Sequence, residues 1–99
     1  MATKKNSKKL EGSYVLPRNL EIAGLEKVYQ DVLKFTGNTY RKFVLDAGQV
    51  ALIDTAGIQF LVQLLTVLRS TGCEVSWSNY SIQIYQMAAE LGMADQLEE

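Results

Sequence analysis

The residues best placed to do chemistry are Asp54 and Thr55, which open the motif Asp54-Thr55-Ala56-Gly57. They lie between a short apolar run and a long apolar segment, where a strand is expected to end and a helix to begin. Either side chain can accept hydrogen bonds from the free N–H groups of a first helical turn, the commonest role of such residues. The hydroxyl can also be phosphorylated, because N–H donors and the positive end of the helix dipole favour a phosphate there. The motif therefore predicts a helix cap and offers Thr55 as a switch.

The rest of the sequence offers no competing chemistry. Histidine is absent and Cys73 is the single cysteine, so the commonest general base and the usual zinc ligands are missing. With no histidine or basic cluster near it, Cys73 is interpreted as a buried, inert thiol. Gly48, Gly57 and Gly72 stand alone instead of forming a phosphate-binding loop. We therefore expect a non-enzymatic protein without catalytic residues, metal site or cofactor.

Charge is divided unevenly along the chain. Lys4, Lys5, Lys8 and Lys9 are four of the ten basic residues, which leaves six basic against eleven acidic residues from position 10 onward, a net charge of −5. A body this acidic argues against a nucleic-acid partner. We interpret residues 1–11 as a disordered basic tail and residues 12–99 as one folded domain. The tail can touch phosphate or anionic lipid, although a solubilising arm is the simpler interpretation.

The sequence also bears on location. No apolar run reaches the roughly 18 residues needed to cross a bilayer, and no apolar stretch follows the basic N-terminus as in a secretory signal. A single cysteine makes disulfides unexpected. We expect a cytoplasmic protein without an integral membrane segment.

Hydrophobic periodicity predicts the elements that position the motif. Strand-like runs lie at 12–17, 43–45, 50–53 and 73–77, and amphipathic helical runs at 20–35, 56–70 and 81–91, with a final turn near 93–97. This alternation predicts a single α/β domain with a mixed, mostly parallel sheet of about four strands and helices packed against it.

The helix expected at 56–70 is unusually apolar. Its apolar stripe is so wide that the polar positions form a single line, made of Gln59, Gln63, Thr66 and Ser70. A helix of this kind is either central and buried or presents part of its surface to a partner.

A resemblance to a known family adds to this interpretation. The run Phe43 to Ala47, then Val50 and the stretch Ile53 to Ile58, resembles the STAS domain, whose pattern is an apolar strand ending in Asp, a short apolar piece, Asp-Ser/Thr-small-Gly and an apolar helix. The glycine, strand and closing Leu-Gly that follow in the family match Gly72, residues 73–77 and Leu91-Gly92. The resemblance covers about residues 12–97. The family includes bacterial anti-sigma factor antagonists and the small STAS subunit of phospholipid-transport ABC complexes.

The resemblance implies a function for the motif. Thr55 matches the family's phosphorylatable hydroxyl and Asp54 the acid before it. Such domains act in signal transduction by partner switching: the unmodified form binds an anti-sigma factor or related serine/threonine kinase, phosphorylation abolishes binding, and a phosphatase restores it. The implied partner-binding residues are Asp54, Thr55, Ala56, Gly57, Gln59 and Gln63.

Two other functions compete with this interpretation. A threonine at this position also occurs in the transport-subunit branch, so the alternative is a STAS subunit seated on the ATPase of a phospholipid-transport ABC complex. An enzyme is disfavoured, because no base, nucleophile–base pair or metal-binding set is visible.

Overall fold

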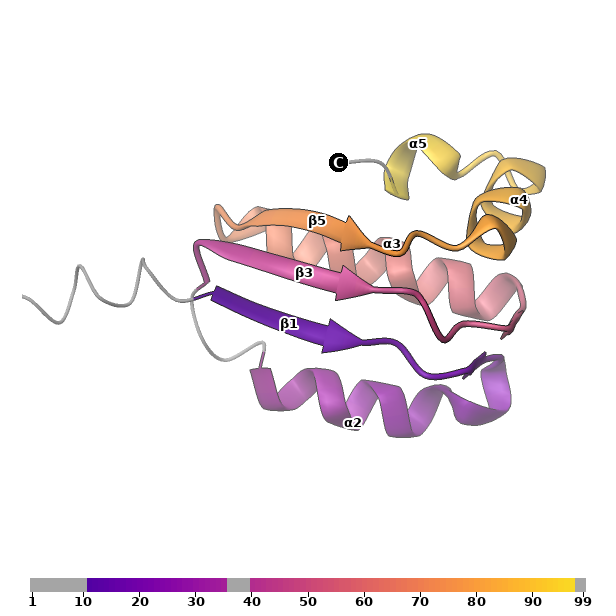
Figure 1. The fold of residues 1–99 in the computed structure, drawn as a ribbon, viewed down its shortest axis with the longest axis horizontal. Coiled ribbons are helices and arrows are strands. Elements are labelled where there is room, and N and C mark those ends of the chain that lie inside the picture. Colours follow the sequence, from indigo (N-terminus) through magenta and orange to yellow (C-terminus); the bar gives the residue numbers. More distant parts are fainter. Residues whose placement is uncertain (1–10, 36–39, 98–99) are drawn as a thin grey trace, which may run out of the picture.

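The computed structural model describes residues 11–35 and 40–97. Residues 1–10 of the predicted tail, residues 1–11, therefore lie outside the described residues, whereas Glu11, the last residue of that prediction, is the first residue of strand β1. Three strands, β1 (Glu11–Val15), β3 (Lys42–Asp46) and β5 (Glu74–Ser78), form a parallel sheet in the order β1-β3-β5. Parallel neighbours need long crossover connections, which the helices supply. Figure 1 shows the three arrows running in the same direction with helix α3 behind them.

The register of this sheet sorts its side chains into rows. Phe43 pairs with Gly12 and Val75, and Leu45 pairs with Tyr14 and Trp77. Because successive side chains of a strand alternate between faces, these rows lie on the same face of the sheet. Phe43 and Leu45 are almost completely buried, so this is the face that helps to form the core.

A second, two-stranded parallel sheet lies beyond the ends of the first. Strand β2 (Asn19–Leu20) pairs with β4 (Leu52–Ile53), with Leu20 opposite Ile53. The predicted α/β class and mostly parallel strand arrangement are confirmed, with the strands of the described residues divided between a sheet of three and a sheet of two. The small sheet matters for function because the Asp54 motif follows β4 directly.

The helix expected at 20–35 begins later than its periodicity indicated. Leu20 belongs to β2, a 3-10 turn (η1) covers Ile22–Gly24, and helix α2 covers Leu25–Phe35. Tertiary contacts explain the delay: Leu20 is fully buried against the core, and the Asn19 side chain accepts a hydrogen bond from the Glu21 N–H at 2.8 Å. Such a side-chain bond competes with helix formation at that point.

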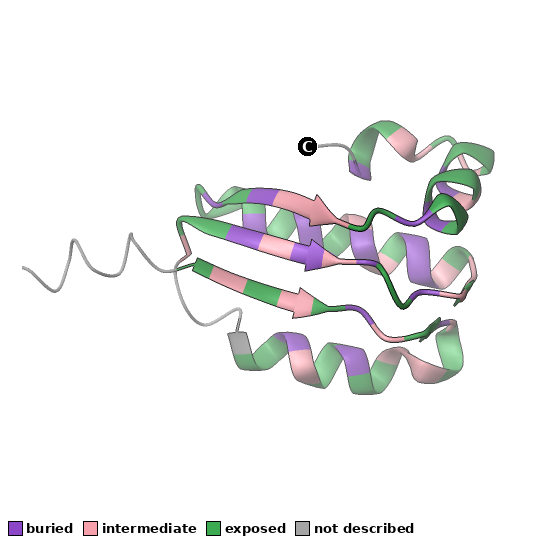
Figure 2. Cartoon of the chain, viewed as in Figure 1, coloured by how far each residue is buried: buried purple, intermediate pink, exposed green. Residues whose placement is uncertain are grey.

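Helix α3 (Thr55–Ser70) is the central helix. Its buried residues form one continuous stripe, which appears as purple bands in Figure 2: Gly57, Ile58, Leu61, Leu64, Leu65 and Leu68. Helix α4 (Ile82–Glu90) is capped by Ser81, whose Oγ accepts hydrogen bonds from the N–H groups of Gln83 and Ile84. The short helix α5 (Ala94–Leu97) closes the described chain, where Trp77 Nε1 donates to the carbonyl of Leu97 at 2.7 Å.

Candidate functional site

The start of α3 is organised by the carboxylate of Asp54. Asp54 has extended backbone angles and occupies the N-cap position, and its Oδ1 accepts a hydrogen bond from the Gly57 N–H at 3.0 Å. Its Oδ2 accepts a second bond from the N–H of Ile22, also at 3.0 Å. One carboxylate therefore ties the turn before α2 to the first turn of α3. The predicted cap is present, and Asp54 provides it.

These hydrogen bonds also fix the charge of the site. The Ile22 N–H and then the Gly57 N–H stabilise the charged carboxylate, so the pKa of Asp54 is held below its ordinary value of 3.8. A permanent negative charge consequently stands immediately before Thr55 at neutral pH.

Thr55 is the first residue of α3 and is exposed. Within the described part of the chain its hydroxyl makes no hydrogen bond, because Asp54 already serves as the cap. The hydroxyl is therefore accessible and unused by the fold. This arrangement separates the two roles that the sequence left together: Asp54 holds the helix, and Thr55 is available for another purpose.

Gly57 lies below the surface, where α3 crosses β2. A Cβ atom at this position would overlap the carbonyl oxygen of Leu20 and would stand 2.8 Å from Cγ1 of Ile53. Only a residue without a side chain lets the helix approach the small sheet this closely. Gly57 thus sets the position of the motif, while its neighbour Ala56 is half-buried.

Gln59 and Gln63 extend the site along α3. Both are exposed and follow Thr55 at four-residue steps, so the three side chains share one face of the helix. No charged residue occurs between Asp54 and Arg69. The face formed by Thr55, Gln59 and Gln63 is consequently a neutral strip of hydroxyl and amide groups.

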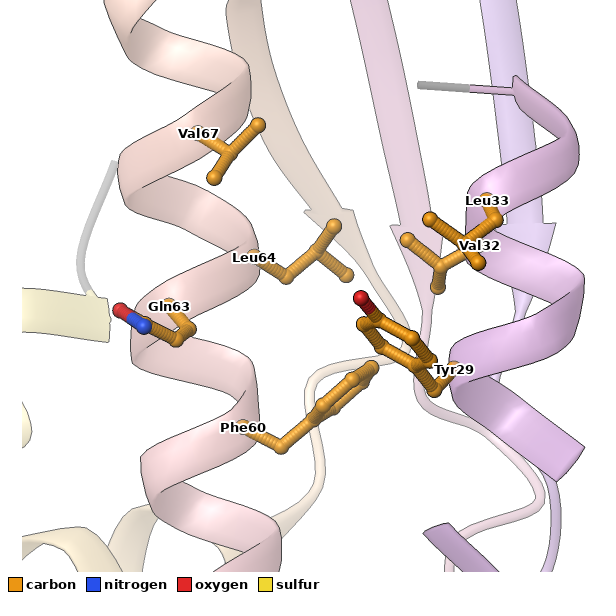
Figure 3. A pocket seen from close by; sticks show the side chains of 7 residues that line it. All are labelled: Tyr29, Val32, Leu33, Phe60, Gln63, Leu64 and Val67. Carbon is orange, nitrogen blue, oxygen red and sulfur yellow. The ribbon is translucent and has the colours of Figure 1, made fainter. Parts of the chain in front are cut away.

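An apolar groove between α2 and α3 adjoins this strip. It has a volume of about 350 Å³ and contains Gln63, so it is continuous with the predicted partner-binding surface. Figure 3 shows the side chains that line it, contributed by the two helices: Tyr29, Val32, Leu33, Phe60, Gln63, Leu64 and Val67. Sequence reasoning did not find this groove. The sequence did contain a signal for it: Tyr29, Leu33, Phe60 and Val67 are more apolar residues than the two helices need to form one buried stripe each.

The remaining predicted features are located as follows. Cys73 is buried, and burial, followed by the charge of Glu74, raises the pKa of its thiol, which confirms the prediction of a buried cysteine. Within residues 11–35 and 40–97, no three acidic, cysteine or histidine side chains gather in a way that could hold a metal ion. In the same residues no helix is long and apolar enough to span a membrane.

A comparison with known protein families finds a match that includes the Asp54 motif and most of the described fold. A family model described as "Mlab, STAS domain" matches residues 16–99, which include both small strands, the Asp54 motif and helices α2 to α5. No curated protein matches the chain in sequence.

Proposed function

The chain belongs to the STAS domain family, and we propose that it is a non-enzymatic regulatory module that binds a protein partner through the face of α3 that begins at Thr55. Phosphorylation of Thr55 controls this binding. STAS domains are generally binding modules without catalytic activity, and the finer assignment rests on the local geometry of the motif. The binding surface consists of the exposed Thr55, Gln59 and Gln63 with Asp54 and Ala56 beside them, whereas Gly57, also predicted to bind the partner, is buried and positions the motif instead.

One observation carries the proposal: the Thr55 hydroxyl is exposed and free of hydrogen bonds within the described residues, while Asp54 performs the capping. If the hydroxyl capped the helix, phosphorylation would disrupt the capping hydrogen bond and destabilise α3. Because Thr55 has no such duty, a kinase can modify it without unfolding the helix. The first-turn N–H groups and the helix dipole also favour a phosphate at this end.

The electrostatic effect of phosphorylation would be large on this surface. The strip from Thr55 to Gln63 is neutral, and a phosphate adds about 1.5 to 2 negative charges at neutral pH. These charges would stand beside the ionised carboxylate of Asp54. A partner that packs closely on the strip would have to remove the phosphate and the Asp54 carboxylate from water. Because this desolvation is costly, the phosphorylated form does not bind.

By resemblance, the partners of such a switch are an anti-sigma factor or a related serine/threonine kinase, together with a phosphatase that restores the hydroxyl. Because such partners act in the cytoplasm, we propose that the module is cytoplasmic. The direct test is purification of the native protein with whatever it binds, followed by intact-mass analysis of both the bound and the free fraction. The proposal expects phosphate on Thr55 in the free fraction only, and equal phosphate in both fractions would contradict it.

A second candidate is a permanent STAS subunit seated on the ATPase of a phospholipid-transport ABC complex. The groove beside Gln63 favours it, because obligate interfaces are more apolar than transient ones and three large apolar side chains of this groove are about half exposed. An ATPase that copurifies in a fixed ratio, unchanged by phosphatase treatment, would select this candidate over the switch.

A further inference from the structure

We infer that the α2–α3 groove receives the apolar face of an amphipathic helix of the partner protein, in addition to the contacts at Thr55, Gln59 and Gln63. The inference rests on the proposed function, because it assumes that a protein docks on this side of α3. It adds the location of the main apolar contact and the kind of segment that makes it.

The groove is incompletely buried by the fold itself. Tyr29 is 52 % exposed, Leu33 49 % and Val67 47 %, although all three are large apolar residues. Val32 and Leu64, which are almost fully buried, line the same groove. In Figure 3 the rings of Tyr29 and Phe60 extend from their two helices toward the space between them. A partner side chain placed there would remove apolar surface from water, which is the main favourable term in association.

The spacing of the lining residues fits a helix. Those on α3 follow the pattern i, i+3, i+4, i+7, namely Phe60, Gln63, Leu64 and Val67, and those on α2 follow i, i+3, i+4, namely Tyr29, Val32 and Leu33. Seven residues of helix rise by about 10 Å, so the groove accommodates roughly two turns of a third helix. An apolar face lying in a groove between two helices is a recurring mode of peptide recognition.

Backbone hydrogen bonding excludes an extended segment. Both walls are α-helices, so their backbone groups pair within each helix and offer no free edge to an incoming strand. A strand laid here would leave its own N–H and C=O groups unpaired against apolar side chains, which is costly. A helix satisfies its backbone internally and presents only side chains.

The lack of charged residues in the groove determines which face of the partner helix can bind there. None of the seven lining residues is charged. The ion pairs of α2, Lys27 with Asp31 and Lys34 with Asp31, involve residues outside the groove lining. A groove of this kind matches an uncharged apolar face, as in the core of protein interfaces, where charged residues are depleted.

The test compares matched substitutions in the full-length protein. Val67→Glu introduces a charge into the groove, and Ile82→Glu is the control, because Ile82 is an exposed apolar residue (62 %) on α4, outside the groove. Both sites are partly in water, and thermal unfolding checks that both variants fold. We expect Val67→Glu to weaken capture of the partner at least tenfold and Ile82→Glu to leave it unchanged.

A photoreactive residue in place of Leu33 then identifies the contacting segment. The inference requires that the crosslinked partner peptide has apolar residues at i, i+3 or i+4, and i+7. A crosslink to a strand, to a charged segment or to a second copy of this chain would overturn it.

Thr55→Glu, tested in parallel, separates the two proposals. If Thr55→Glu loses the partner while Val67→Glu retains it, the groove inference fails and the proposed function stands. If Val67→Glu loses the partner while Thr55→Glu retains it, the groove inference stands and the Thr55 switch fails. If both variants retain it, both proposals are wrong.

Discussion

Asp54 Oδ2 accepts a hydrogen bond from the N–H of Ile22 at 3.0 Å, across 32 residues of sequence. The same carboxylate caps α3 through Gly57. The turn that leads into α2 and the start of α3 are thereby joined at one point, directly beside Thr55. This contact ties η1, which leads into α2, to the residue that caps α3, at the end of α3 where the hydroxyl lies.

The division of labour between Asp54 and Thr55 predicts unequal effects of alanine substitution. Asp54→Ala removes two hydrogen bonds, one of them the cap of α3, and should lower the free energy of unfolding clearly more than Thr55→Ala does. Thr55→Ala removes an exposed side chain that has no hydrogen-bond partner among the described residues, and it should change the free energy of unfolding by no more than about 0.5 kcal/mol. Urea unfolding measures both. Equal losses would show that Thr55 shares the capping.

The lowered pKa of Asp54 predicts a pH dependence with a definite sign. Because the folded-state pKa lies below 3.8, the ionised carboxylate stabilises the fold above that pH, and this contribution is lost as the pH falls through the folded-state pKa. In Asp54→Asn the group cannot titrate. The difference in stability between wild type and Asp54→Asn should therefore shrink on acidification below pH 3.8. A difference that stays constant down to pH 2 would contradict this account.

Tyr14 predicts the corresponding effect at alkaline pH. Its hydroxyl donates to Asp31 at 3.1 Å, and burial, followed by this hydrogen bond, raises its pKa to about 12. The neutral phenol stabilises the fold below its ordinary pKa of 10, and the contribution is lost as the pH rises from 10 through about 12. Tyr14→Phe should flatten the loss of stability over that interval in denaturant titrations. An identical alkaline slope in both proteins would exclude Tyr14 as its source.

Gly57 predicts a steric effect. Gly57→Ala forces a Cβ against the Leu20 carbonyl and should lower the free energy of unfolding by about 3 kcal/mol, even though alanine favours helix formation. Gly24→Ala is the matched control, because a Cβ there stands 3.6 Å from the nearest backbone oxygen, an ordinary contact. It should be nearly neutral. Similar losses in both variants would point to a general cost of replacing glycine instead of the Leu20 contact.

The sequence predicted the parts of this structure that depend on local pattern. The apolar stripe of α3 and the position of Asp54 before it follow from residue spacing and capping chemistry, and both agree with the structure. The start of α2 was wrong, because the burial of Leu20 opposite Ile53 depends on a pairing across 33 residues. Tyr29 is one of the apolar residues of the amphipathic run at 20–35, yet it is half exposed, since periodicity does not determine how far apart α2 and α3 lie.

The candidate site was predictable to a different extent. Thr55 is singled out by its type and position, but the residue type does not show which of Asp54 and Thr55 caps α3. Asp54 does so through Gly57, and its second hydrogen bond, from Ile22, is a long-range contact that no local pattern reports. The groove beside Gln63 arises only when the side chains of two helices are brought together. The sequence shows that these residues are apolar, but it does not predict that they remain partly exposed next to one another.

The central claim is that phosphorylation of Thr55 abolishes partner binding. Its most direct test is the affinity of the captured partner for three full-length proteins: the unmodified wild type, Thr55→Val, and a form phosphorylated stoichiometrically on Thr55, each verified by intact mass. Isothermal titration calorimetry should give similar affinities for wild type and Thr55→Val, which adds no charge, and a loss of at least a hundredfold for the phosphorylated form. An unchanged affinity of the phosphorylated protein would contradict the account.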